Sequence, residues 1–219
     1  TQYRPYIHCH LAYNDTTPNV VWTELQARRE AGQIFYYDHR TRIRHWSPDR
    51  GVQTVYQVPA GVADRYDDVD NGLSGPLAGF NTLSADWPQV GFSSDGSETY
   101  VAFLTFRDGD VDPTADMSLP GIVTGVGFGD ISACLTRAGE GWSAPQNLTN
   151  TPRTDERFFS LAPRNPGGRL HIVGQASTTD RAGVSLIGDR GLAPGNLLCA
   201  IFFMQPRLAS SVLDAPEPA

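Results

Sequence analysis

Short apolar runs alternate with clusters of turn residues along the whole chain, and this pattern predicts an all-β protein. Within runs such as 87–93, 99–106 and 131–135, the apolar residues are mostly β-branched or aromatic and often alternate with polar ones, as in half-buried strands. Gly, Pro, Asp and Ser bound the runs. The motifs SDGS and NPGG predict hairpin turns, because Gly tolerates positive φ. A helix remains an alternative only over 22–32.

Three segments repeat the same order of runs, with first strands expected near Asn19, Trp87 and Arg157. These starting points lie 68 and 70 residues apart. Each segment predicts a four-stranded antiparallel meander. Because one such sheet cannot bury both faces alone, we expect the three to stack face to face around shared cores. Insertions at 107–129 and 178–195 fall at equivalent places and should emerge on one rim. Two alternatives stay open: either the segments 1–17 and 60–86 contain further strands, or the stack stays open and leaves an apolar face that needs a partner.

The end of the second segment carries a longer motif. After the strand DISACLTR come a turn, the run WSAPQNL and a polar linker with DER that leads into the next strand. This order resembles the repeats of TolB-like and Asp-box (BNR, sialidase-like) β-propellers. Against the Asp-box pattern S-x-D-x-G-x-T-W, Gly139 and Trp142 match, whereas Leu135, Arg137 and Gly141 depart from its Ser, Asp and Thr. The resemblance implies antiparallel four-stranded meanders stacked as a partial or small β-propeller of about three blades.

The propeller interpretation divides the chain into five parts. These are an N-terminal extended segment (1–18), blade 1 (19–58), a linker (59–86), blade 2 (87–149) and blade 3 with the C-terminal tail (150–219). Trp46, Trp87 and Trp142 could stack on sugars or contact a partner, but each is expected to fill a groove between blades.

The first segment has a second resemblance. Trp22, a GQ turn, an aromatic run, DH and Trp46 follow one another in the order seen in WW domains, which bind proline-rich peptides. By that resemblance Trp22 and Tyr36 would pack a small core, while His39 and Trp46 would face the peptide. The fit is incomplete, since Phe35 stands at a ligand-facing Tyr position. A meander with two Trp residues equally describes a propeller blade, so both alternatives stay open.

Acidic residues gather in the first insertion. Within DGDVDPTAD the candidate ligands are Asp108, Asp110, Asp112 and Asp116. Hard cations such as Ca²⁺ take several oxygen ligands from one loop, but this loop lacks the Gly and the closing Glu of an EF-hand. We therefore expect a solvated acidic loop and no cofactor, with a Ca²⁺ site as the alternative. The stretch 64–72 is a weaker candidate of the same kind.

The motif HCH should place His8 and His10 on one face of an extended strand and Cys9 on the other. Two imidazoles could begin a zinc or copper site, but no third ligand is evident nearby, so we expect structural histidines. Cys134 and Cys199 lie in apolar runs and are expected to be buried. Three cysteines without a CxxC motif argue against a disulfide framework.

Four charged residues gather in the linker sequence PRTDER. In a sialidase-like enzyme, Arg153 and Arg157 would clamp a substrate carboxylate, while Asp155 or Glu156 would protonate the leaving group. In a TolB-like repeat the same residues tie neighbouring blades together, and we favour this structural interpretation. The motifs GxSxG and HExxH and the P-loop are absent from the sequence. The sequence therefore leaves open whether the protein is an enzyme, and leans against it.

Composition narrows the cellular setting. The 219-residue chain has a net charge of −7, which argues against a nucleic-acid partner. It contains 17 Arg and no Lys, which indicates a GC-rich bacterial coding sequence. No apolar run reaches the length of a transmembrane helix. Because the chain begins with Thr, we expect that a signal or anchor was removed and that the protein is periplasmic or extracellular.

These patterns together predict a non-catalytic, propeller-like binding or scaffold protein. We expect an accessory subunit of a bacterial envelope complex, associated with the membrane through other protein subunits. The candidate contact residues are Trp46, His39, Arg153 and Arg157. A sialidase-like glycoside hydrolase or glycan-binding propeller is one alternative function, and a WW-type adaptor for proline-rich peptides is another.

Overall fold

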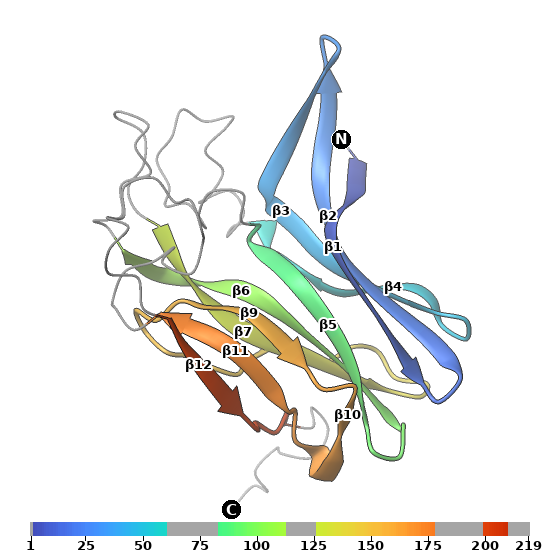
Figure 1. Ribbon diagram of the computed structural model, residues 1–219. Coiled ribbons are helices and arrows are strands. Elements are labelled where there is room, and N and C mark those ends of the chain that lie inside the picture. Colours follow the sequence, from blue (N-terminus) through green and yellow to red (C-terminus); the bar gives the residue numbers. More distant parts are fainter. Residues whose placement is uncertain (1, 61–82, 113–125, 178–198, 210–219) are drawn as a thin grey trace, which may run out of the picture.

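The computed structural model describes residues 2–60, 83–112, 126–177 and 199–209. Within these ranges it does not describe the side chains of 35–39, 107–109, 111, 112, 126 and 199. The described chain consists almost entirely of β-strands and their connections, with one turn of 3-10 helix at Pro166–Gly168 and a single helical residue at Ala60. This confirms the all-β prediction. The strands form three sheets, here called A, B and C (Figure 1).

Sheet A is a four-stranded antiparallel meander. Its strands, in spatial order, are β1 (Gln2–Asn14), β2 (Thr17–Glu30), β3 (Gln33–Ser47) and β4 (Gly51–Gln57). The expected start near Asn19 is wrong, since the preceding segment supplies the first strand. Residues 33–47 form one strand where two were predicted. The helix alternative over 22–32 is also wrong, because β2 covers 22–30 and a turn follows at 31–32.

Sheet B forms the middle of the molecule. Its strands, in spatial order, are β10 (Arg164–Asn165), β5 (Ala85–Ser93), β6 (Glu98–Asp112), β7 (Val126–Arg137) and β8 (Gln146–Asn147). The meander from β5 to β8 follows the predicted run order. The short β10 adds a parallel pair to β5.

Sheet C is antiparallel and consists of β12 (Cys199–Met204), β11 (Ile172–Ser177) and β9 (Glu156–Leu161). It has three strands within the described residues, where the sequence predicted four.

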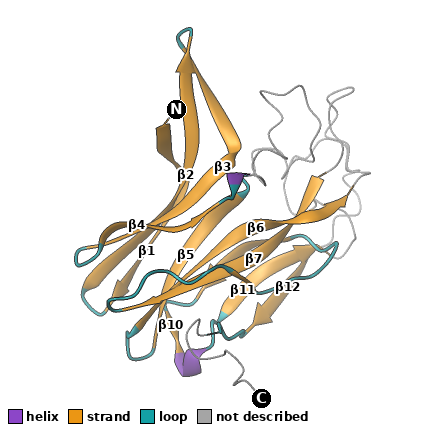
Figure 2. Ribbon diagram, turned by 180° about the vertical axis from the view of Figure 1, so that it is seen from behind, coloured by secondary structure: helices purple, strands orange, loops and turns teal. Residues whose placement is uncertain are grey.

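The three sheets stack face to face, as predicted, with sheet B between the other two (Figures 1 and 2). The core between sheets A and B includes Val21, Ile43, Val90, Phe92, Val101 and Phe103. The core between sheets B and C includes Tyr100, Ile131, Phe159, Leu161, Leu170 and Ile172. Sheet B therefore buries both of its faces, whereas sheets A and C each cover one core and turn their other face outward.

The first strands of the three sheets pack on one another, β1 on β5 and β5 on β9. Each of these strands has an irregularity in its pairing, which contains His8, Trp87 or Phe158. The His8 ring stacks on Trp87 with centroids 4.1 Å apart, and Trp87 meets Phe158 edge to face at 4.8 Å. Three rings thus join the three sheets along one edge of the stack.

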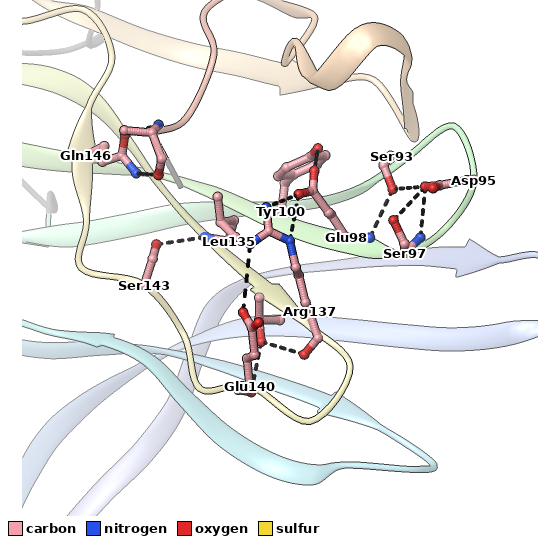
Figure 3. A network of polar contacts seen from close by, with 12 residues as sticks. Ser93, Asp95, Ser97, Glu98, Tyr100, Leu135, Arg137, Glu140, Ser143 and Gln146 are labelled. Atoms are coloured by element: carbon pink, nitrogen blue, oxygen red, sulfur yellow. Dashed lines mark hydrogen bonds and ion pairs between the residues drawn. The ribbon is translucent and has the colours of Figure 1, made fainter. Parts of the chain in front are cut away.

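Polar contacts fix the turns at one end of sheet B (Figure 3). Asp95 accepts hydrogen bonds from the Ser93 hydroxyl at 2.6 Å and from the Ser97 backbone N–H at 3.1 Å. These hydrogen bonds lower the pKa of Asp95 to about 2. On the neighbouring strands, Arg137 binds the Glu98 carboxylate at 2.6 Å. The predicted SDGS hairpin is therefore confirmed as the connection between β5 and β6.

The hairpin of β2 and β3 projects beyond the stacked sheets as a long arm (Figure 1). Strand β1 pairs with the arm along Gln2–Pro5.

Candidate functional site

The outward face of sheet A carries a continuous apolar row. The row crosses all four strands through the directly paired residues Leu11, Val20, Trp46 and Val52. Residues opposite each other in an antiparallel pair point to the same side of the sheet, so these four side chains lie side by side. Tyr13 extends the row along β1, two residues beyond Leu11. Leu11, Tyr13 and Val52 are 51%, 55% and 53% exposed.

A second row on the same face combines Trp22 with charged residues. Trp22 pairs with Cys9 on one side and with Arg44 on the other, and its indole N–H donates to Glu24 at 3.0 Å. The Glu24 carboxylate also accepts from Arg42 at 2.6 Å and lies 3.8 Å from Arg44. Two guanidinium groups therefore share one carboxylate, and this row carries a net positive charge.

The composition of this face is typical of protein–protein interfaces. Trp, Tyr and Arg are the residue types that most often contribute the binding energy of such interfaces. The face of sheet A places Trp22, Trp46, Tyr13, Arg42 and Arg44 close together. A row of large apolar side chains across four strands is also unusual on a face turned to water, where polar residues normally alternate with the core positions.

A hollow of about 650 Å³ lies at the base of the arm. The residues that line it are Gln2, Arg4, Pro5, Tyr6, Leu25, Ala27, Arg28, Arg29 and Ile34. Three arginines thus surround a floor of apolar side chains, on a chain whose net charge is −7. The chemistry of the hollow suits an acidic segment with apolar side chains.

The structure separates the four predicted contact residues. Trp46 lies in the middle of the apolar row on the outward face of sheet A, so the expectation that it fills a groove between blades is wrong. The His39 side chain is outside the described residues. Arg153 is exposed and its backbone N–H donates to Asp110 at 3.2 Å. Arg157 is 2% exposed and binds Asp155 at 2.7 Å. One arginine is therefore on the surface and the other is buried, so the two do not form the predicted carboxylate clamp.

The charged residues of PRTDER tie sheets B and C together. The Asp155 carboxylate accepts from the Gly129 backbone N–H of β7 at 2.9 Å. The Asp155 backbone N–H donates to the Ser177 hydroxyl of β11 at 3.1 Å. These contacts agree with the blade-junction interpretation. Because Asp155 is fully buried and Glu156 is 3% exposed, neither carboxyl is open to a sugar substrate.

Glu156 lies in an unusual environment for a carboxyl. Burial raises its pKa to about 8, the nearby charge of Asp130 adds to the effect, and a hydrogen bond from Thr151 opposes it. The Asp130 carboxylate accepts hydrogen bonds from the Asn147 amide at 2.7 Å and from the Thr149 hydroxyl at 3.0 Å. Glu156 is therefore expected to be mostly protonated at neutral pH, as part of the buried junction between the sheets.

The predicted acidic loop lies only partly within the described residues. Asp110 accepts the Arg153 N–H, while Asp116 and the side chains of Asp108 and Asp112 are outside the description, as is the stretch 64–72. Among the described side chains, no three metal-binding residues come close enough to hold an ion. The Ca²⁺ alternative stays a prediction.

The motif HCH has the predicted orientation. His8 and His10 face the body of the molecule, where His8 pairs with Asp86 at 2.9 Å and His10 accepts the Val90 N–H at 3.1 Å. Burial lowers the pKa of His10, in keeping with an unprotonated ring nitrogen that accepts a hydrogen bond. Cys9 is exposed on the opposite face. Both histidines therefore have structural partners.

The remaining tryptophans and cysteines agree with the sequence analysis where they are described. Trp142 packs against the core between sheets A and B, and Trp87 against the core between sheets B and C. Cys134 is buried, and the side chain of Cys199 is not described. Sequence reasoning missed Leu11 and Tyr13 as surface residues, although the outward half of the alternation in 9–13 was the signal that could have identified them.

No family model matches the chain, and the searches of curated proteins and solved structures give no match either. Within the described ranges, no helix has the length and hydrophobicity that crossing a membrane requires.

Proposed function

We propose that this protein is a non-catalytic binding scaffold, a partial propeller-like stack of sheets that serves as an accessory subunit of a bacterial envelope complex. The apolar, aromatic and arginine-rich outer face of sheet A is the observation that supports this most. Such a face loses unfavourable contact with water when another protein chain covers it.

Other observations support separate parts of the proposal. The three stacked sheets, whose first strands pack together along one edge, are the arrangement expected of neighbouring propeller blades. The resemblance to TolB-like repeats and the use of Arg alone as the cationic residue support a bacterial envelope protein that is periplasmic or extracellular. Asp155 and Arg157 belong to the group of charged residues that a sialidase-like enzyme would use in catalysis. Both are buried and form an ion pair with each other, which supports a structural role for them.

Native mass in a gentle membrane extract tests the proposed function. Trp46→Arg places a charge in the middle of the apolar row. Ala144→Arg places the same charge at an exposed residue between β7 and β8, outside both this face and the hollow beneath the arm. We expect the wild-type protein and A144R to migrate in a complex with other proteins, and W46R to be released from it. A wild-type protein that migrates without any other protein species would overturn the accessory-subunit proposal.

A further inference from the structure

The hollow at the base of the arm belongs to the inner face of sheet A, the face that sheet B covers elsewhere. Leu25, which lines the hollow, lies four residues from the core residue Val21 on β2 and therefore points to the same side of the sheet. Leu83, two residues before β5, packs on Leu25 and Ala27. Beyond this contact the described chain leaves the inner face open as the hollow. Most of the lining consists of residues that pair across neighbouring strands and so share this face: Gln2 with Ala27, Arg4 with Leu25, Arg29 with Ile34.

Two arginines stand at opposite ends of this lining. Arg4 lies opposite Leu25, and Arg29 lies four residues beyond Leu25 along β2. A strand rises about 3.3 Å per residue, so the two arginines are about 13 Å apart along the strands, with apolar side chains between them. In the described chain neither arginine forms an ion pair with a carboxylate, whereas Arg28 pairs with Glu30 at 3.3 Å. The hollow therefore offers two separate positive charges on either side of an apolar floor.

We propose that the hollow binds an acidic segment of a partner protein, in which two carboxylates four residues apart flank an apolar residue. In an extended chain such carboxylates are also about 13 Å apart, so each can meet one arginine. The residue midway between them points to the same side and covers the apolar floor. The inference rests on the proposed function, because it assigns the chemistry of a second contact between the same subunit and its partner.

Charge and shape favour an acidic protein segment over other occupants. The chain has a net charge of −7, so the arginines of the hollow are a local concentration of positive charge that attracts an anion. A single anionic headgroup is too small to contact two arginines about 13 Å apart. The lining is the face of a sheet, along which an extended chain can lie, and its apolar floor favours a segment that also buries an apolar side chain.

Fluorescence anisotropy of a labelled peptide with the purified full-length chain tests the hollow. The probe is the peptide Ser-Asp-Ser-Leu-Ser-Asp-Ser. One control peptide has Asn in place of both Asp residues, and the other has Ser in place of Leu. We expect the probe to bind and each control to bind about tenfold more weakly. No binding of the probe up to about 1 mM peptide, or equal binding of either control, would overturn the proposal.

Charge reversal shows whether the peptide binds in the hollow. Arg4→Glu and Arg29→Glu each replace an attraction with a repulsion, and each should weaken binding of the probe about tenfold. Arg169→Glu is the matched control, because Arg169 is an exposed arginine outside the hollow, and it should leave binding unchanged. The two arginines of the hollow lie on different strands, so one variant serves if the other fails to fold. Unchanged binding in the folded hollow variants would overturn the proposal.

Two other occupants give different results. The chain's own stretch 64–68 has the same pattern, since Asp64 and Asp68 flank Tyr66, and this stretch lies outside the described residues. If the probe binds only after Asp64 and Asp68 are both replaced by Ser, the chain's own segment holds the hollow and the partner is overturned. Vesicles of phosphatidylglycerol that bind the wild type but not R29E, together with no binding of the probe, would indicate a membrane surface and would also overturn it.

The native extract and the peptide separate the two proposals. If the purified chain binds the probe but migrates without other proteins in the extract, the accessory role is overturned while the hollow still binds acidic segments. If W46R is released from a native complex but the purified wild type does not bind the probe, the accessory role stands and the assignment of the hollow is overturned.

Discussion

Replacing Glu156 with Gln should remove a penalty that this carboxyl imposes on the folded state as the pH rises. Glu156 is 3% exposed, and its Oε2 atom accepts no hydrogen bond from the described residues. Burial, with a further contribution from the charge of Asp130, raises its pKa from 4.5 to about 8. Protonated Glu156 is therefore well accommodated in the junction between sheets B and C, and the ionised form is not.

The sign and size of the effect follow from the two pKa values. Below about pH 4.5 the carboxyl is protonated in both the folded and the unfolded chain, so its ionisation costs nothing. Between pH 4.5 and 8 the unfolded chain releases the proton and the folded chain keeps it, so stability falls as the pH rises. One unit of pKa corresponds to 1.36 kcal/mol, which gives a cost of about 3 kcal/mol at pH 7.

Urea unfolding followed by tryptophan fluorescence at pH 5 and at pH 8 measures this cost. E156Q, which cannot ionise, should gain about 2 to 4 kcal/mol relative to the wild type between these pH values. Glu140→Gln is the matched control, because the Glu140 side chain is 48% exposed and its stability difference should stay flat. If E156Q and the wild type keep a constant difference in unfolding free energy from pH 5 to pH 8, the reasoning about this junction is refuted.

Three further substitutions test other parts of the structure. Gly91→Ala places a Cβ 2.5 Å from the backbone carbonyl oxygen of Ala162 and should lower the unfolding free energy by about 1 to 3 kcal/mol. Gly141→Ala is the control, because its Cβ would have no atom within 4 Å. Equal losses of stability in the two variants would contradict the close packing of β5 against the segment that leads into β10. Arg157→Met removes the cation that is paired with the buried Asp155 carboxylate, and urea unfolding should show a loss of about 3 to 5 kcal/mol; an unchanged midpoint would mean that the pair is not buried. Arg29→Glu reverses a charge in the hollow beneath the arm and should lower the amount of partner protein recovered with the chain from extracts, while its own melting temperature stays unchanged.

Much of the fold could be predicted from the sequence because the main strands of sheets B and C are apolar runs of mostly β-branched and aromatic residues, separated by turn residues such as SDGS. The run order of the meander, the SDGS hairpin and the face-to-face stacking all follow from that pattern. The first strand was harder to place. Ile7, Leu11 and Tyr13 of β1 point outward, so its apolar residues do not mark a buried face, and the irregular pairing between Pro5 and Cys9 interrupts the period.

The candidate surface could be predicted only in part. The resemblance to a WW domain identifies Trp46 as a candidate contact residue. Trp46 forms an apolar surface only together with Leu11, Val20 and Val52 beside it. Those neighbours belong to three other strands, and their register is set by the turns and the irregular pairing in three dimensions. Arg153 and Arg157 could not be told apart from the sequence. Nothing in PRTDER indicates that Arg157 is buried and Arg153 is exposed.

Thiol labelling of Cys9 tests most directly whether another protein chain covers the outer face of sheet A. Cys9 is exposed in the isolated chain and pairs with Trp22 on that face. Cys134 is buried, and burial raises the pKa of its thiol to about 12, so it should react slowly; Cys199→Ser removes the third thiol. In a gentle extract we expect Cys9 to react much more slowly in the otherwise wild-type protein than in the Trp46→Arg variant. Equal and fast labelling of Cys9 in both would show that the face is open to solvent and would contradict the account.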